Sequence, residues 1–590
     1  MRLVHPFLVV AVALGAALLA WSIDNDYYLR ILFMMSVYYL CAAGMNVLVG
    51  YAGQKSLGQA GLFAAGAYAV ALLTTSFDLN PWLAIAAAAA VAGLCGVLIA
   101  WPSLRVRGPY LAMVTLAFGI VVEKLVSEWT EVFGGAQGIF GIKPLTFAGT
   151  PFTSLHWVWF GIALGAITHL LLRNLLSGRF GRAFLSLQAD EIAAESIGVS
   201  VYRYKVLAFV IAAVTCGIAG AMVAQQNQYV NSDFITFHLS IFILLLVLFG
   251  GSGSLYGPLI GAVSLTLIDA LLARWPAVQH FAYGALLLFA LYVMPNGVAG
   301  LFDRLFSRKA AVDFRPALRE QPALTLSTRE TDPSQPLLDV ASVSKNFGGV
   351  RPAQDVTFRL QHGHVHALIG PNGAGKTTMI NMISGVIAPS SGRIAFVGKE
   401  IGGEESHEIC RLGIGRTFQN LRLFAGLSVL ENVLLGQHCR MKNGFWASLL
   451  ALPSSGREEA AAHRRASAIL GVVGLTELAQ APAGSLPYGL QRRVELARAL
   501  ATEPQLILLD EPAAGLNPQE TAELGKLIVK ISKLGITVLM VEHHMDLVMS
   551  ISDHVIVLDY GVKIAEGTPA SVQADNKVIE AYLGAEAEAA

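Results

Sequence analysis

The sequence has few charged residues for its length. Asp, Glu, Lys and Arg make up 14% of its 590 residues, whereas they make up about a quarter of a typical soluble protein. The mean hydropathy is +0.57. Acidic and basic residues number 41 each, so the formal net charge is zero and gives no electrostatic reason to expect nucleic-acid binding. The low charge predicts a membrane protein or a membrane half, and the length predicts several domains.

Cysteine is also scarce. The five cysteines are odd in number, scattered along the chain and without any C-x-x-C spacing, which argues against a disulfide or zinc framework. They are Cys41, Cys95, Cys216, Cys410 and Cys439.

Long apolar runs fill the first 300 residues. Several are close to the ~20 residues that span a bilayer. The first run superficially resembles a secretory signal, but we interpret it as a transmembrane helix because similar runs follow at once. We therefore predict about ten transmembrane helices, near 6–20, 28–50, 57–76, 82–101, 109–127, 154–173, 205–224, 236–250, 255–273 and 280–302.

The distribution of basic residues predicts the orientation of these spans. With both ends in the cytoplasm, the inner loops contain most of the Lys and Arg of the apolar half, and Lys143 and Arg274 are the exceptions on the outside. This asymmetry obeys the positive-inside rule and leaves the second half of the chain in the cytoplasm. The inner-loop residues are Lys55, Arg105, Arg107, Arg173, Arg179, Arg182, Arg203, Lys205, Arg304, Arg308 and Lys309.

Two connecting segments stand out. Residues 189–198, in the longest inner loop, predict a short amphipathic helix that ends at Gly198 and either docks on a soluble partner or simply connects two spans. Residues 308–336 contain four prolines and little apolar periodicity, which predicts a flexible linker. The predicted organisation is a transmembrane domain at 1–307, a linker at 308–336 and an α/β domain at 337–590.

The second half contains a phosphate-binding loop of the form G-x-x-x-x-G-K-[ST]. A predicted strand at 365–369 precedes it, and residues from Lys376 through Ile383 are predicted to start a helix after it, which is the context that this loop needs. The lysine is expected to reach the β- and γ-phosphates of a nucleotide, and the threonine after it to coordinate Mg²⁺. The nucleotide-binding residues are Gly370, Pro371, Asn372, Gly373, Ala374, Gly375, Lys376, Thr377 and Thr378.

Two further predicted strands end in residues able to support hydrolysis. The strand at 506–510 ends in Asp510 and is followed by Glu511, and the strand at 537–541 is followed by Glu542 and His543. The carboxyl ends of parallel strands are where α/β sites are built. We expect Asp510 to hold Mg²⁺, Glu511 to act as general base toward water, and His543 to contact the γ-phosphate region.

Together these residues resemble the ATP-binding-cassette ATPases. The resemblance implies that Phe347 stacks on adenine, that Gln419 senses Mg²⁺ and contacts the permease, and that His543 is the switch histidine. It places residues 486–493 at the signature that caps the γ-phosphate bound by an opposite subunit. The implied signature contacts are Leu486, Gly489 and Gln491.

The signature departs from the family pattern L-S-G-G-Q. Pro487 replaces the serine and Leu490 stands where glutamine is usual, while Asn517 stands where the following loop commonly has Asp. The missing hydroxyl predicts that one of two ATP sites, the partner's, is weakened, although the Gly489 amide at a helix N-terminus can still act.

A closer resemblance is to bacterial branched-chain amino acid importers. Residues 416–419, 422–424, 431–433, 488–493 and 511–518 resemble their ATPase, as do a helical insert near 440–465 and residues 581–584. Residues 50–58, 104–112 and 250–258 resemble one of their permeases, and 187–199 resembles its coupling helix, with Ile192 in place of the leading glutamate. The resemblance implies that two normally separate subunits are fused in this chain.

The resemblance implies several partners and leaves the substrate open. We expect a second permease subunit, a second ATPase subunit or a homodimer, a periplasmic solute-binding protein, and the bacterial inner membrane around the chain. Leucine, isoleucine and valine are the expected substrates, with urea, short amides or aromatic acids as alternatives. A half-size exporter is disfavoured because the predicted spans are short, Gly-rich and numerous, and a soluble ATPase is excluded by the apolar runs.

Overall fold

The computed structural model describes residues 4–103, 106, 108–147, 149–294, 296–306 and 335–587. Most of the predicted linker at 308–336 lies outside these residues, as do Arg105 and Arg107 of the predicted inner loops. The chain divides into two compact units. The first comprises Met1–Gln188, Val201–Ala310 and Ser448–Ala451, and the second comprises Ala189–Ser200, Ala311–Ala447 and Leu452–Ala590.

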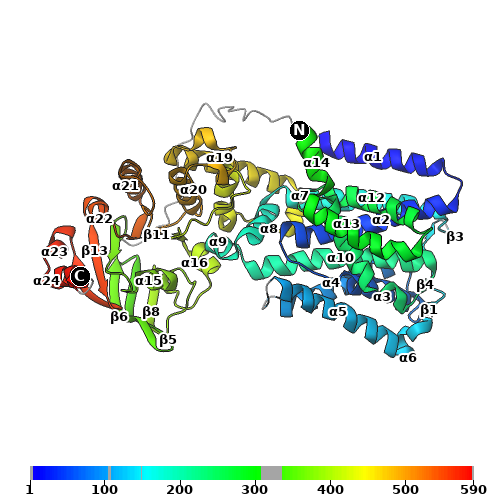
Figure 1. Cartoon of the computed structure of the whole chain (residues 1–590), viewed down its shortest axis with the longest axis horizontal. Coiled ribbons are helices and arrows are strands. Elements are labelled where there is room, and N and C mark those ends of the chain that lie inside the picture. The colour runs from blue at the N-terminus through cyan, green and yellow to red at the C-terminus, as the bar shows by residue number, and fades with distance from the viewer. Residues whose placement is uncertain are drawn as a thin grey trace. The chain divides into compact units, whose positions relative to one another are not determined.

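The first unit is a bundle of apolar helices (Figure 1). In the described chain, six helical segments are long and apolar enough to cross a membrane, and four other apolar helices are shorter. The described helices of the unit with ten or more residues are α1 (Val4–Trp21), α2 (Asp26–Met45), α3 (Gln59–Thr75), α4 (Pro81–Ser103), α5 (Pro109–Glu128), α7 (Ser154–Leu176), α8 (Arg179–Ala189), α10 (Val201–Asn227), α11 (Phe237–Gly250), α12 (Gly257–Leu272), α13 (Pro276–Val293) and α14 (Gly297–Phe306).

Small residues let the central helices approach closely. A Cβ added at Gly66 of α3 would lie 2.0 Å from the carbonyl oxygen of Gly217 in α10, and one at Gly220 would lie 2.0 Å from that of Phe63. Apolar helices in lipid gain little from burying apolar surface, so close backbone contact of this kind supplies much of their packing energy.

The apolar runs predicted the helix positions better than the helix ends. The run at 280–302 is not one helix, because α13 ends at Val293 and α14 starts at Gly297, whose φ of +63° favours glycine. The loop predicted at 174–204 contains the helix α8, and α2 continues as a π-helix over Asn46–Tyr51.

The second unit is built on two sheets. One has the strand order β10-β11-β12-β7-β13-β14, in which only β14 is antiparallel to its neighbour, and the other has the order β6-β5-β8-β9 and is antiparallel. The strands are β5 (Leu338–Phe347), β6 (Val350–Leu360), β7 (Val365–Ile369), β8 (Ser391–Phe396), β9 (Lys399–Glu400), β10 (Ile414–Arg416), β11 (Leu506–Asp510), β12 (Thr537–Val541), β13 (His554–Asp559) and β14 (Val562–Gly567).

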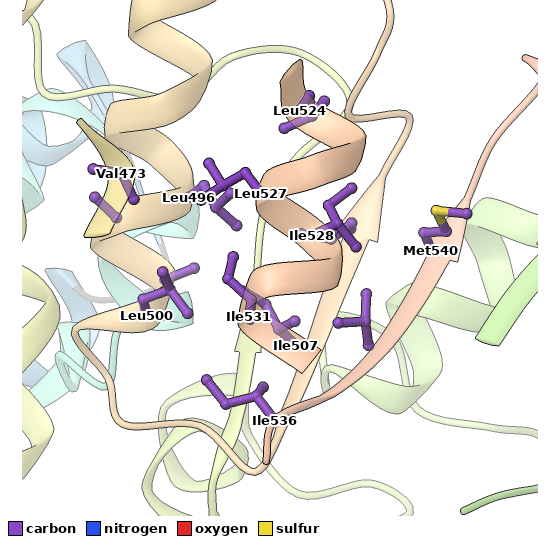
Figure 2. Close-up of a cluster of buried hydrophobic side chains, with 14 of the residues drawn as sticks. Val473, Leu496, Leu500, Ile507, Leu524, Leu527, Ile528, Ile531, Ile536 and Met540 are labelled. Atoms are coloured by element: carbon purple, nitrogen blue, oxygen red, sulfur yellow. The ribbon is translucent and has the colours of Figure 1, made fainter. Parts of the chain in front are cut away.

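The parallel strands are buried on both faces, which explains their continuous apolar sequences. Every residue of β7, β11 and β12 is buried. Figure 2 shows one face of this core, where side chains of α20 (Tyr488–Leu500) and α21 (Pro518–Ser532) pack over β11 and β12. The other described helices of the unit are α9 (Glu191–Ser196), α15 (Lys376–Ile383), α16 (Ser406–Leu412), α17 (Val429–Gly436), α18 (Phe445–Leu449), α19 (Pro453–Val473), α22 (Met545–Ile551), α23 (Pro569–Gln573) and α24 (Asn576–Ala587).

The buried His366 of β7 makes the stability of this unit depend on pH. Burial lowers its pKa to about 4, and its Nε2 accepts a hydrogen bond from the backbone amide of Gln361 at 3.1 Å. The unfolded chain binds a proton near pH 6.5, whereas the folded chain does so only near pH 4, so stability falls as the pH drops between these values. We expect protonation of this one residue to lower the free energy of unfolding by about 2 kcal/mol between pH 7 and pH 5.

The measurement compares the wild-type chain with His366→Asn, which has no group that titrates in this range. Thermal unfolding of the second unit is followed at several pH values, and the difference between the two slopes isolates the histidine. Equal pH dependence in the two proteins would show that His366 is protonated equally in the folded and unfolded states.

Candidate nucleotide site

The phosphate-binding loop lies between β7 and α15, as its sequence predicted. Gly375 is the N-cap of α15 with φ of +97°, and a Cβ there would lie 1.9 Å from the carbonyl oxygen of Pro352. Gly373 also has positive φ, +83°, and has open space where a Cβ would be. The loop therefore has open space beside Gly373 and leads into the N-terminus of α15, where an anion is favoured.

Lys376 is turned into the loop that precedes it. It is 5% exposed, and its Nζ donates to the carbonyl oxygens of Gly370 and Pro371 at 2.8 Å each. Burial lowers the pKa of Lys376, while the carboxylates of Glu511 and Asp510 oppose that shift. The ammonium group is thus held at the loop by neutral carbonyls, which a phosphate can replace with a stronger, charge-assisted contact.

Asp510 lies at the end of β11 with one carboxylate oxygen free. Its Oδ2 lies 3.4 Å from Arg416 Nη2, and its Oδ1 is buried without a hydrogen-bond partner. Burial raises the pKa of Asp510, Arg416 opposes the shift, and Glu511 adds to it. An unpaired buried carboxylate oxygen fits a divalent cation, because oxygen is the ligand that Mg²⁺ prefers. The carboxylate is therefore suited to hold Mg²⁺ together with Thr377 of the loop.

Glu511 and His543 lie together beside this carboxylate. Glu511 has a φ of +48°, an unusual conformation for a residue other than glycine, and its amide donates to the carbonyl oxygen of Val541 on the neighbouring strand. Its Oε1 lies 3.1 Å from His543 Nε2. Such backbone strain is typically stored at functional sites.

Glu542 has a supporting role that the sequence did not reveal. It is 1% exposed, its Oε1 accepts from the amide of Ala513 at 2.6 Å, and its Oε2 accepts from the amide of His543 at 3.0 Å. One buried carboxylate thus ties the segment after Glu511 to the segment that carries the histidine.

The signature segment forms the start of α20. Pro487 is the N-cap residue, and the Gln491 side chain donates to the carbonyl oxygen of Leu486 at 2.7 Å. Leu490 packs against the apolar core, which explains an apolar residue at that position. A Cβ at Gly489 would lie 2.6 Å from Glu520 Oε1, so an unexpected carboxylate from α21 lies against this helix N-terminus.

Two other predicted site residues, Phe347 and Gln419, make no described side-chain contact with the residues above. Phe347 ends β5 with half of its surface exposed, and Lys345 Nζ lies 5.0 Å from its ring centroid. Gln419 is exposed after β10. Asn517 is the N-cap of α21 and forms a capping box with Glu520, which gives it a structural role.

Comparison with known proteins identifies both units. A family model described as "Branched-chain amino acid transport system / permease component" matches residues 27–291, "ABC transporter" matches 353–514, and "Branched-chain amino acid ATP-binding cassette transporter" matches 562–588. The branched-chain amino acid transport ATP-binding protein BraF of Pseudomonas aeruginosa is 46% identical over 252 residues, covering 42% of this chain and 99% of that protein. The chain belongs to the branched-chain amino acid ABC transporter family.

The permease half of this transporter has its own relative. The permease protein LivM of Salmonella typhimurium is 33% identical over 315 residues, covering 49% of this chain and 73% of that protein. A nucleotide-free ATP-binding cassette of known crystal structure is 34% identical, covers 42% of this chain and 99% of its own, and has a TM-score of 0.37. The family matches and the two named relatives show that the transporter is a membrane protein in which a permease is fused to an ATPase that binds nucleotide and couples ATP hydrolysis to transport.

Two buried arginines of the signature helix, both paired with Glu495 of the same helix, join it to the segment that carries Gln419. Arg492 Nη1 donates to the carbonyl oxygen of Phe418 at 2.6 Å, and its Nη2 donates to that of Gln419. Arg498, the largest fully buried side chain, donates to the carbonyl oxygen of Arg422 at 2.6 Å. Removing one member of such a network leaves a buried charge unpaired. The sequence shows Arg492 and Arg498 in the signature helix, but it does not show which carbonyl oxygens they bind.

The predicted coupling segment belongs to the same unit as the nucleotide site. Asp190 is the N-cap of α9, and its Oδ2 lies 2.6 Å from Arg422 Nη1. Gly198 has φ of +84° and lies against Cys439, where a Cβ would be 2.5 Å from the cysteine Cβ. The short helix predicted at 189–198 is present as Glu191–Ser196.

Proposed function

We propose that this chain imports branched-chain amino acids across the bacterial inner membrane as a fused permease and ATPase subunit. The observation that carries the proposal is the presence, in one chain, of separate matches to a branched-chain amino acid permease and to its ATP-binding partner. The two relatives that match these halves, an ATP-binding protein and a permease protein, are separate proteins in their own organisms. The chain would supply one permease half and one ATPase half.

At the nucleotide site, we assign the chemistry to four side chains. Lys376 and the amides of the loop bind the β- and γ-phosphates, and Glu511 accepts a proton from the attacking water. His543, 3.1 Å from Glu511, orients that carboxylate and contacts the γ-phosphate region. Asp510, Thr377 and Gln419 would hold Mg²⁺, which would neutralise phosphate charge when bound.

The transporter needs partners to complete this site. The signature at 486–491 would cap the nucleotide of a second ATPase, which is either another subunit or a second copy of this chain, and a second permease would complete the path. Asp190 and Arg422 would link the coupling segment to the segment after Gln419. A periplasmic solute-binding protein would deliver the cargo. ATP drives the cycle only because it binds the closed pair of ATPases more tightly than the open pair.

Urea, short amides and aromatic acids are the alternative cargoes, because selectivity resides largely in the binding protein. The test is to purify the chain with its partner subunits in liposomes and to measure ATP hydrolysis and uptake with each candidate solute and the binding protein. Stimulation by leucine, isoleucine or valine supports the proposal. Stimulation by urea or an amide alone would replace it, and outward movement of solute would make the protein an exporter.

Pro487→Ser is expected to strengthen one ATP site of the assembled transporter. Serine restores a hydroxyl at the N-cap of the signature helix, where it can donate to the γ-phosphate that the partner binds. One charge-assisted hydrogen bond of roughly 1.5 kcal/mol corresponds to about 10-fold in ATP affinity. ATP titration of the complex measures this change.

The control for that substitution is Pro487→Ala, which removes the ring without adding a hydroxyl. If Pro487→Ser leaves both the ATP affinity and the hydrolysis rate of the complex unchanged, the serine hydroxyl is not needed and the partner's site is not weakened.

A further inference from the structure

Helix α3 begins inside the helical bundle of the first unit and not at its edge. The carbonyl oxygen of Gln59, its first residue, lies 3.4 Å from Cys216 Sγ of α10. Cys216 lies ~22 Å along that 27-residue helix, close to its midpoint. Cys216 also lies 3.8 Å from Cys41, which is near the middle of the 26-residue helical segment Asp26–Tyr51 that α2 forms with the π-helix after it. The N-terminus of α3 is therefore near the middle of the helices that surround it.

The backbone around this helix start is satisfied by side chains. The amide of Leu57 donates to Thr115 Oγ1 at 2.9 Å, and the amide of Ala60 donates to Ser240 Oγ at 3.0 Å. Non-helical backbone at membrane depth is tolerated only where protein surrounds it or where it lines a cavity. Many transporters bind their cargo at the ends of helices that start or break at membrane depth.

The side chain of Gln59 has no hydrogen-bond partner, unlike the backbone around it. Gln59 has no exposed surface, and both its Nε2 and its Oε1 are without a hydrogen-bond partner. A buried amide with two unsatisfied ends is destabilising, more so where no water competes. Gln225 is equally buried and its Oε1 is also without a partner, but its Nε2 donates to the carbonyl oxygen of Pro81 at 3.2 Å, so only one end of that amide is unsatisfied.

We propose that Gln59 and the first turn of α3 bind the polar head of the transported solute. This inference rests on the proposed function and specifies where in the permease half the cargo is recognised. An amide offers one donor and one acceptor, which match the carboxylate and the ammonium group of a neutral, zwitterionic amino acid. The positive end of the α3 dipole favours the carboxylate.

The surroundings of Gln59 suit the apolar side chain of such a solute. Leu62 and Phe63 are almost fully buried, and the ring of Phe118 from α5 lies 2.9 Å from where a Cβ of Gly61 would be. An uncharged amide in an apolar setting accepts a net-neutral solute without burying a lone charge. Because Gln59 has no exposed surface here, the solute reaches it in the state in which these helices separate.

The test is Gln59→Met in the complete transporter, because Met has nearly the same length and no polar atoms. Leucine uptake, ATP hydrolysed per leucine and the unfolding temperature are measured in liposomes with the binding protein. We expect the uptake efficiency to fall by about 10-fold or more, the ATP cost per leucine to rise, and the unfolding temperature to stay equal or rise because an unpaired amide is removed. Gln225→Met is the matched control. We expect it to lower the unfolding temperature and to leave the ATP hydrolysed per leucine unchanged.

Two results overturn the inference. Uptake by Gln59→Met within about 2-fold of wild type would show that the amide does not contact the solute, and a lowered unfolding temperature with parallel losses of uptake and hydrolysis would show a structural role. Should Gln59→Met fail to assemble, Gln59→Asn decides instead, since its shortened amide raises the leucine KM if the inference holds and leaves it unchanged if not. If the wild-type complex moves urea or an amide and not leucine, the proposed function fails, while the effect of Gln59→Met on that solute still tests the site.

Discussion

Glu511→Gln is expected to lower the rate of ATP hydrolysis by about 10²- to 10⁴-fold, the usual contribution of a general base. In the wild-type chain, His543 Nε2 lies 3.1 Å from Glu511 Oε1. The glutamine amide keeps the shape of the side chain and can still lie near His543, but it cannot accept the proton of the attacking water. ATP binding should be retained, because the phosphate loop and Asp510 are untouched. The variant should therefore accumulate with ATP bound, and leucine uptake should stop.

Single-turnover hydrolysis and nucleotide binding by the assembled transporter separate these two effects. Glu400→Gln is the matched control, since Glu400 lies exposed on the short strand β9 and its removal should change neither quantity. A hydrolysis rate for Glu511→Gln within about 10-fold of wild type would assign the base to another group.

Lys376→Ala is expected to abolish both ATP binding and uptake. The side chain makes two hydrogen bonds to loop carbonyls and is 5% exposed, so its ammonium group is already positioned at the phosphate site. Losing its charge-assisted contacts to phosphate costs roughly 3 kcal/mol, or more than about 100-fold in ATP affinity. Binding of a fluorescent ATP analogue measures the loss directly.

Lys399→Ala serves as the control because Lys399 is exposed on β9. Normal uptake by Lys376→Ala would contradict the role assigned to the lysine. A fall in unfolding temperature without a change in ATP affinity would show that the lysine mainly holds the loop together through Gly370 and Pro371.

The nucleotide unit was the more predictable half. The strands expected at 365–369, 506–510 and 537–541 are observed with those bounds, and a helix starts at Lys376 as expected. Each parallel strand is buried on both faces and reads as a short apolar run, while the glycines and the lysine of the loop mark the turn between strand and helix. Local sequence was sufficient because local geometry defines each of these elements.

The membrane half was less predictable. Apolar composition located the helices, but it could not show that α3 begins within the bundle or that the last run divides at Gly297. The positions of unpaired groups were also invisible, since whether Gln59 or Asp510 Oδ1 has a partner depends on residues far away in the chain.

By itself, the sequence determined the identity of the phosphate loop, the position of the strand that ends in Asp510 before Glu511, and the membrane character of the first half, because each depends on residues that are neighbours along the chain. Only the tertiary structure decided that His543 meets Glu511, that Asp190 pairs with Arg422, and that Gln59 is enclosed without a hydrogen-bond partner. These contacts join segments separated by tens to hundreds of residues. Packing of the whole unit brings them together, and no local pattern encodes which distant group will be there.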